Sequence, residues 1–188
     1  MPFFGELELE LFLYGVKASL NHYLASRPGV AVQSLPELID FNRDHADTVM
    51  PFFQQEFLEM ALEAGDMGDQ HYQFLVAELQ RLSRTEGIDR AIQEHHLDAI
   101  IAPTEGSPSF VIDLLSGDHL EPYGCSSPPA VAGYPHITVP AGYVQGLPVG
   151  LSFFSTAYTE TTLLGLAHAF EQAIQTRQPP QFLATITG

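Results

Sequence analysis

Residues 132–155 constrain the fold of this chain more than any other segment, because two strand patterns there flank an explicit turn. In residues 136–141, and again in residues 147–154, apolar side chains recur at every second position, which is the period of a strand. The Gln145-Gly146 pair between the two runs is a turn signal. Both runs are short and rich in Gly, Pro and β-branched residues, a composition that disfavours a helix. We therefore predict a β-hairpin, or two adjacent strands joined by a short excursion.

The second of these runs also predicts what surrounds the sheet. It ends in Phe153-Phe154, and adjacent residues of a strand face opposite sides of the sheet. Since both residues are large and apolar, both faces of the strand need to be covered. This pattern is typical of a sheet flanked by helices.

The sequence before residue 98 is nearly all helical by pattern. Apolar residues at steps of three and four predict helices at residues 6–25, from 35 onward, at 51–64, 69–83 and 88–96. Ser34 and Glu37 have the spacing of a capping box, and Pro51 suits the first turn of the third helix. A strand is predicted at residues 99–102, and Thr159 is predicted to cap a last helix that runs to about Gln175.

The length of 188 residues is sufficient for one domain with a real core. We expect a single domain over residues 1–188, mainly helical over 1–97, with strands, an irregular loop and the last helix over 98–188. Between residues 103 and 135 neither the helical nor the strand period holds. An irregular segment of this length inside a compact domain is usually a functional loop or a disordered one.

Charge and composition exclude two classes of partner. The chain has seven Lys and Arg residues and 23 Asp and Glu residues, which give a formal net charge of −16. Such a field repels phosphate backbones and anionic lipids, so we expect no nucleic acid and no membrane as a partner. No apolar run approaches a membrane span, and the first residues are acidic where a signal peptide is basic. With no targeting segment to read, the expected compartment is cytoplasmic by default.

Several motifs carry a resemblance to a known family. Gly133-Tyr134-Pro135, followed by ITVPAG at 137–142 and GLPVGL at 146–151, resembles the C-terminal motif of amidase-signature hydrolases. The run DAIIAPT at 98–104 resembles a strand of the same family. Within the family the chain is similar to bacterial peptide amidases, through SGDH at 116–119 and SSP at 126–128. The likeness is strong after Thr85 and weak before it.

The resemblance implies a fold and a chemistry. The fold class would be α/β, the C-terminal portion of an α/β/α sandwich with a mixed sheet and a helix-rich N-terminal half. Whole enzymes of this family hydrolyse a carboxamide to an acid and ammonia with no metal or cofactor, and the peptide-amidase branch acts on C-terminal amides. The loop from residue 104 to 135 would help to line the acyl side of the cleft. Its candidate substrate-binding residues are Asp118, His119, Ser126 and Ser127.

The same resemblance implies that the catalytic groups are missing. The family uses two serines and a neutral lysine, following the rule that a hydroxyl nucleophile needs an adjacent base. It places them before the region recognised here, beside a glycine-serine-rich stretch that this chain lacks. Lys17 is the only lysine, and we expect it on the surface, on the flank of an amphipathic helix. Ser19 points about 200° away from it around the helix, so the pair is poorly placed for proton transfer. We expect no catalytic residue in this chain.

Three other groups of residues have a competing functional interpretation. Cys125, Ser126 and Ser127 follow a glycine, but Pro128-Pro129 stands where backbone N–H groups would bind an oxyanion, which favours a structural or substrate-lining role. Glu94-His95-His96 lacks the H-E-x-x-H spacing of a metal site, so we expect a solvated helix end and no metal. Asp118-His119 fits either a pocket wall or a hydrogen-bonded turn, and the sequence leaves both open.

Three hypotheses about function follow. The chain is the C-terminal region of an amidase and is inactive alone; or it is a binding or assembly module that keeps only the fold; or it is an independent hydrolase built on Cys125, Ser126 or Ser127 with His119. The first is favoured. Because strand edges and apolar faces of a partial sheet need covering, we expect a partner, either the missing N-terminal catalytic half or a second copy of the chain.

Overall fold

The computed structural model describes residues 2–106, 124–180 and 182. The chain divides into two compact units, residues 1–79 and 80–188. The change from helical to strand-containing sequence expected at residue 98 lies inside the second unit. Within the described residues, no helix combines the length and apolar character needed to cross a membrane.

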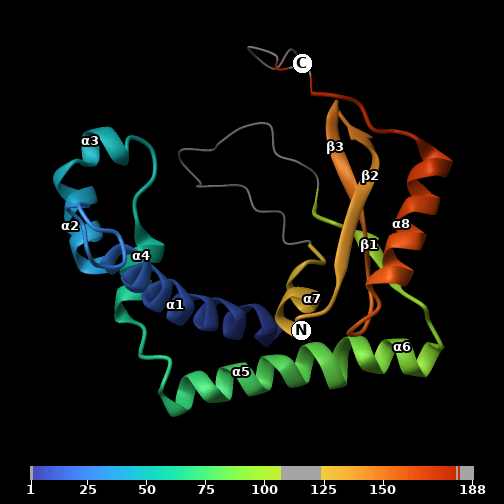
Figure 1. Cartoon of the computed structure of the whole chain (residues 1–188), viewed down its shortest axis with the longest axis horizontal. Helices are drawn as coiled ribbons and strands as arrows, with labels where there is room; N and C mark the ends of the chain where they lie inside the picture. Colours follow the sequence, from blue (N-terminus) through green and yellow to red (C-terminus); the bar gives the residue numbers. More distant parts are fainter. Residues whose placement is uncertain (1, 107–123, 181, 183–188) are drawn as a thin grey trace. The chain divides into compact units, whose positions relative to one another are not determined.

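The first unit is helical (Figure 1). Its elements are α1 (Pro2–Ala25), α2 (Leu35–Asp44), α3 (Ala46–Val49), α4 (Glu56–Glu63) and the greater part of α5 (Gln70–Ser83). The core forms where α1, α2 and α4 meet, and its buried members are Leu13, Leu35, Ile39 and Ala61. The predicted helices at 6–25, from 35 and at 69–83 are therefore confirmed.

The predicted capping box at the start of α2 is confirmed in part. Ser34 Oγ accepts a hydrogen bond from the backbone N–H of Glu37 at 3.4 Å. The Glu37 carboxylate, however, accepts from the backbone N–H of Gln33 at 2.7 Å, one residue before the cap. Each bond satisfies an N–H group that no carbonyl of the helix reaches, which fixes where α2 begins.

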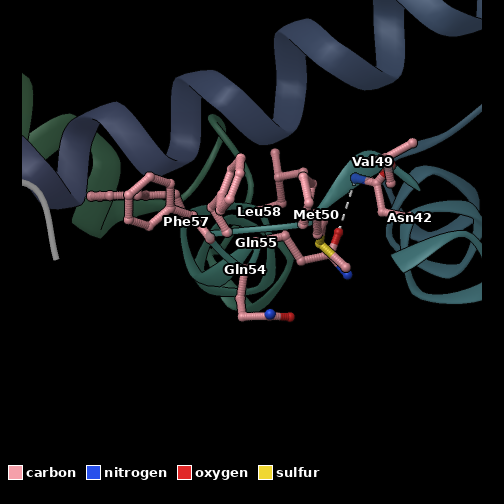
Figure 2. Close-up of a pocket in the computed structure, with 10 residues that line it drawn as sticks. Asn42, Val49, Met50, Gln54, Gln55, Phe57 and Leu58 are labelled. Atoms are coloured by element: carbon pink, nitrogen blue, oxygen red, sulfur yellow. Dashed lines mark hydrogen bonds between the residues drawn. The ribbon is translucent and has the colours of Figure 1, made fainter. Parts of the chain in front are cut away.

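The predicted start of the third helix at Pro51 is wrong. The helix there, α4, begins at Glu56, and residues 51–55 are not helical. The reason is the buried side chain of Gln55, whose Nε2 donates to the carbonyl oxygen of Ile39 at 3.1 Å. Its Oε1 accepts from Asn42 Nδ2 at 3.0 Å, drawn as a dashed line in Figure 2. These bonds hold the segment against α2 in a non-helical conformation, and tertiary contact overrides the local preference.

Lys17 is half-buried in the first unit rather than free on the surface. Its ammonium group donates a hydrogen bond to the carbonyl oxygen of Ala64, the C-cap residue of α4. A cation at a helix C-terminus satisfies an orphan carbonyl and interacts favourably with the helix dipole. The single lysine of the chain thus has a structural role in the described residues.

The second unit is built around a three-stranded sheet (Figure 1). After the end of α5 come the π-helix η1 (Arg84–Ile88), α6 (Asp89–His95), β1 (Ile100–Pro103), α7 (Ser127–Ala132), β2 (His136–Val144), β3 (Leu147–Phe154) and α8 (Glu160–Ile174). The strand order is β1-β3-β2, and both pairings are antiparallel. The predicted hairpin is confirmed, and Gln145 and Gly146 form its turn with φ values of 50° and 81°.

Both faces of β3 are covered, as Phe153-Phe154 predicts. Phe153 packs with Val139 of β2 and with Leu163 and Ala167 of α8. On the other face, Phe154 packs with Ile88 at the end of η1 and with Ala132 at the end of α7. Helices therefore flank the sheet, and the α/β class is confirmed for this portion of the fold.

His136 begins β2 on the Phe154 side of the sheet. Its ring meets Phe154 edge-on, with 6.0 Å between ring centroids. Its Nε2 atom is buried and has no hydrogen-bond partner within the described residues. Burial without a partner disfavours the imidazolium form and lowers the pKa of His136 below its ordinary value.

The stability of the chain should therefore depend on pH through His136. An unfolded histidine has a pKa of about 6.5. The stabilisation that the folded state gains from neutral His136 is therefore complete above that pH and is lost as the pH falls through the lower folded pKa. Urea unfolding of the native chain and His136→Phe at several pH values measures the effect, since Phe keeps the ring packing but cannot titrate. We expect the stability of the native chain to fall more steeply below about pH 6.5; parallel pH profiles would contradict this account of His136.

Candidate functional site

A cluster of three hydroxyl side chains lies beyond Phe154 on the same face of the sheet. Thr104 follows β1, Thr138 lies on β2 and Ser152 on β3, where Thr138 and Ser152 are direct register partners. Thr104 Oγ1 lies 2.5 Å from Thr138 Oγ1, and Ser152 Oγ donates to Thr104 Oγ1 at 2.8 Å. We refer to these residues as the hydroxyl cluster. Ser152 is completely buried, so its hydrogen bond to Thr104 is what makes its burial tolerable.

Gly150 makes room for the hydroxyl cluster. A Cβ atom at this position would lie 2.6 Å from Thr138 Oγ1 and 2.7 Å from Thr104 Oγ1. The backbone of Gly150 cannot move away either, because its carbonyl accepts a hydrogen bond from the Thr104 N–H at 2.9 Å. Glycine is therefore required here by the close approach of the two threonine side chains.

The start of α7 is attached to the end of β1 beside this cluster. The backbone N–H of Cys125 donates to the Thr104 carbonyl at 3.2 Å, and the Cys125 thiol lies 3.7 Å from the same oxygen. Glu105 and Gly124 form an isolated antiparallel bridge. The residues after Cys125 are thereby held next to the polar part of the sheet.

Two of the four predicted substrate-binding residues lie at this point. Ser126 is exposed and precedes α7, while Ser127 is half-buried and is its first residue. Neither side chain makes a hydrogen bond to another described residue. Asp118 and His119 lie outside the described residues. Their predicted role stays a prediction.

The other end of α7 is fixed by a polar contact that the sequence did not reveal. Arg84 Nε donates to the Ala132 carbonyl at 2.7 Å, and the guanidinium lies 5.4 Å from the centroid of the Tyr134 ring. The Tyr134 hydroxyl donates to Asp89 at 2.9 Å. Burial, reinforced by this bond to a carboxylate, raises the pKa of Tyr134. The phenol therefore stays neutral and keeps its bond, and α7 is held at both ends.

A cavity of about 380 Å³ lies at the same end of the sheet. It is lined by Pro103, Glu105, Gly106, Ala141, Val144, Val149, Gly150 and Leu151. Gly150 thus separates this cavity from the hydroxyl cluster on the other side of its backbone. Among the described lining residues, Glu105 carries the one charge and the others are apolar or glycine.

Among the described residues, the hydroxyl cluster offers hydrogen bonding. The cluster hydroxyls bond to one another and to no imidazole or amine of the described chain, and a hydroxyl needs an adjacent base to become a nucleophile. Over residues 2–106, 124–180 and 182, no group of three or more His, Cys, Asp or Glu side chains is placed to hold a metal ion. The arrangement can position a polar ligand, since hydroxyls both donate and accept.

Replacing Gly150 tests the hydroxyl cluster. We expect Gly150→Ala to destabilise the second unit by about 1–3 kcal/mol, because the added methyl overlaps two threonine side chains. Gly165→Ala is the matched control: Gly165 lies in α8 with no atom within 4 Å of its would-be Cβ, so alanine should stabilise by about 0.5–1 kcal/mol. Urea midpoints of the two variants measure this. Equal shifts in both would contradict the close approach at Gly150.

Comparison with known proteins assigns a family to this arrangement. The sequence profile described as Amidase matches residues 7–164. A probable amidase of Arabidopsis thaliana is 39% identical over 171 residues, which cover 89% of this chain and 29% of the plant protein. A native peptide amidase from Stenotrophomonas maltophilia is 39% identical, with a TM-score of 0.82 over 96% of this chain and 36% of its own.

A second solved structure agrees with the first. The peptide amidase PAM, solved in complex with the competitive inhibitor chymostatin, is 40% identical, with a TM-score of 0.86 over 95% of this chain and 36% of its own. The chain thus spans about a third of the length of the relatives that it matches. A family profile that covers most of the sequence, together with these structures, leads to one conclusion: the chain belongs to the amidase family.

Proposed function

We propose that this chain forms the C-terminal part of an enzyme that hydrolyses carboxamides, with C-terminal amides of peptides as the substrate class. The observation that carries the proposal is the likeness to a peptide amidase over 95% of the chain at 40% identity. The hydroxyl cluster supports it, because its members lie in or next to the motifs DAIIAPT, ITVPAG and GLPVGL. A peptide amide offers both N–H donors and carbonyl acceptors, which hydroxyl groups can match.

In this proposal the chain holds substrate while the bond-breaking groups come from elsewhere in the enzyme. The three hydroxyls of the cluster have no base beside them among the described residues, and the ammonium group of Lys17 is bonded to the Ala64 carbonyl. A neutral lysine that abstracts a proton needs access to the nucleophile. We propose that the chain by itself releases no ammonia.

Four residues are proposed to line the acyl side of the cleft. Ser126 and Ser127 lie at the start of α7, next to a backbone that is fixed to β1, and their hydroxyls bond to no other described residue. Asp118 and His119 belong to the same proposal on sequence grounds alone. Since the lining hydroxyls bind rather than react, replacing them should raise KM more than it lowers kcat.

The partner in this proposal is the N-terminal catalytic half of the fold, or a second copy of the chain. Among the described strands, β1 and β2 are both edges, and Ile101 on β1 is 60% exposed. Unpaired edges and exposed apolar side chains favour association with another chain. A partner that covers β1 would bury this residue.

An ammonia-release assay on N-acylated dipeptide amides tests the proposed function. We expect no ammonia from the chain alone, and turnover when it is mixed with a separate polypeptide comprising the part of the Stenotrophomonas maltophilia peptide amidase that precedes the matching region. Ser126→Ala and Cys125→Ala in the mixture serve as controls: turnover at saturating substrate should survive in both, since neither is proposed as a nucleophile.

Two results would contradict the proposal. Ammonia release by the chain alone that is abolished by Ser126→Ala or Cys125→Ala would identify an independent hydrolase. Tight binding of the peptide amide with no turnover, even in the mixture, would identify a binding module that keeps the fold without the chemistry.

A further inference from the structure

Arg84 and Asp89 lie five residues apart at the turn between α5 and α6, and both side chains reach Tyr134. In a regular α-helix, residues five apart point about 140° away from each other. Here the backbone N–H of Asp89 donates to the Arg84 carbonyl, an i→i+5 bond that widens the turn into η1. The Arg84 guanidinium lies 5.4 Å from the centroid of the Tyr134 ring, and the Asp89 carboxylate accepts from the Tyr134 hydroxyl at 2.9 Å. The wider turn lets two side chains that a regular helix would separate meet the same ring.

Gly87 allows this wide turn. Its φ and ψ angles of −108° and −105° are not helical. A Cβ atom at this position would lie 2.5 Å from the carbonyl oxygen of Leu82, so glycine is required by the close approach of the backbone. A turn of this kind often marks a functional site, and Arg84 is its first residue.

The helix α7 lies beside this turn (Figure 1), and Arg84 contacts its last residue. Arg84 Nε donates to the carbonyl oxygen of Ala132 at 2.7 Å. Carbonyl oxygens in the last turn of a helix have no partner within the helix, and a cation there satisfies one of them. Arg84 and Tyr134 are half-buried and Ala132 is buried, which strengthens the bond relative to one in water.

The position of α7 depends on such contacts because the helix is too short to be stable alone. It has six residues, Ser127–Ala132, and isolated helices shorter than about 12 residues are marginal in water. Two of the six, Pro128 and Pro129, have no N–H group to donate. The helix is therefore placed from its two ends, by the backbone bond to the residue after β1 at the first and by the Arg84 bond at the last.

We propose that Arg84 is a positioning residue of the candidate site. By holding the last residue of α7, it fixes the direction of the helix and, about 9 Å away, the place of the Ser126 and Ser127 hydroxyls. The position of α7 is a property of the second unit alone. What the two serines bind rests on the proposed function, so the two claims need separate tests.

Cys125, the only cysteine of the chain, reports on the first end of α7. Its half-buried thiol lies 3.7 Å from the Thr104 carbonyl oxygen. The rate of its reaction with N-ethylmaleimide, without denaturant, measures how often this contact opens. We expect Arg84→Met to raise the rate by about tenfold or more, the factor lost with a hydrogen bond to a charged group. Arg84→Lys keeps a charged donor without the planar guanidinium, and its rate should lie between.

Two control variants separate positioning from general stability. Arg90→Met removes an exposed arginine of α6 that pairs with Glu94, and its rate should equal that of the native chain. Leu163→Ala destabilises the second unit from the other face of the sheet, where Leu163 is buried against Phe153. Its urea midpoint should fall while its rate without denaturant stays close to the native rate. An unchanged rate in Arg84→Met, or an equal rise in either control, would overturn the proposal. If urea shows that Arg84→Met does not fold, Arg84→Lys against Arg90→Lys makes the same comparison.

The consequence for the ligand is measured in the mixture with the N-terminal part of the peptide amidase. Arg84→Met should raise KM for an N-acylated dipeptide amide more than it lowers kcat, whereas Arg90→Met should change neither. A fall in kcat with no change in KM would overturn the proposal. A mixture with no turnover would contradict the proposed function instead, and the reaction rates of Cys125 would then decide whether Arg84 positions α7.

Discussion

Packing on both faces of β3 is the constraint on which the second unit depends. Phe153 and Phe154 are adjacent in sequence and therefore point to opposite sides of the sheet, where α8 covers one and the η1 and α7 residues cover the other. Burying one large aromatic side chain contributes about 1.5–3 kcal/mol, so this pair alone accounts for several kcal/mol. Neither face can be lost without exposing one of the rings.

The candidate site exists because the side chains on one face of β3 change along the strand from aromatic to polar and then to glycine. On the Phe154 face, the next inward positions are Ser152 and then Gly150, where side chains become polar and then absent. The space is taken by Thr104 and Thr138 from the neighbouring strands, which bond to each other and to Ser152. The apolar end of this face fixes the sheet, and the polar end can meet a ligand. The same strand thus carries the packing at one end and, in the proposed function, contributes to ligand recognition at the other.

The sequence predicts those parts of the structure that local patterns determine. The hairpin, its Gln145-Gly146 turn and the two covered faces all follow from side-chain alternation and turn chemistry. The wrong start of α4 and the half-buried position of Lys17 come from contacts between distant residues, Gln55 with Ile39 and Lys17 with Ala64, which no local pattern encodes. The hydroxyl cluster was missed for the same reason. Its members are 14 to 48 residues apart, and only the register of the sheet brings them together.

Hydrogen exchange along β3 tests the central role of this strand most directly. Residues 151–154 pair with β1 on one side and with β2 on the other. Because successive N–H groups of a strand point to opposite neighbours, the account predicts slow exchange at all four consecutive amides. Alternating slow and fast exchange along 151–154 would mean that one neighbour is missing and would contradict the account.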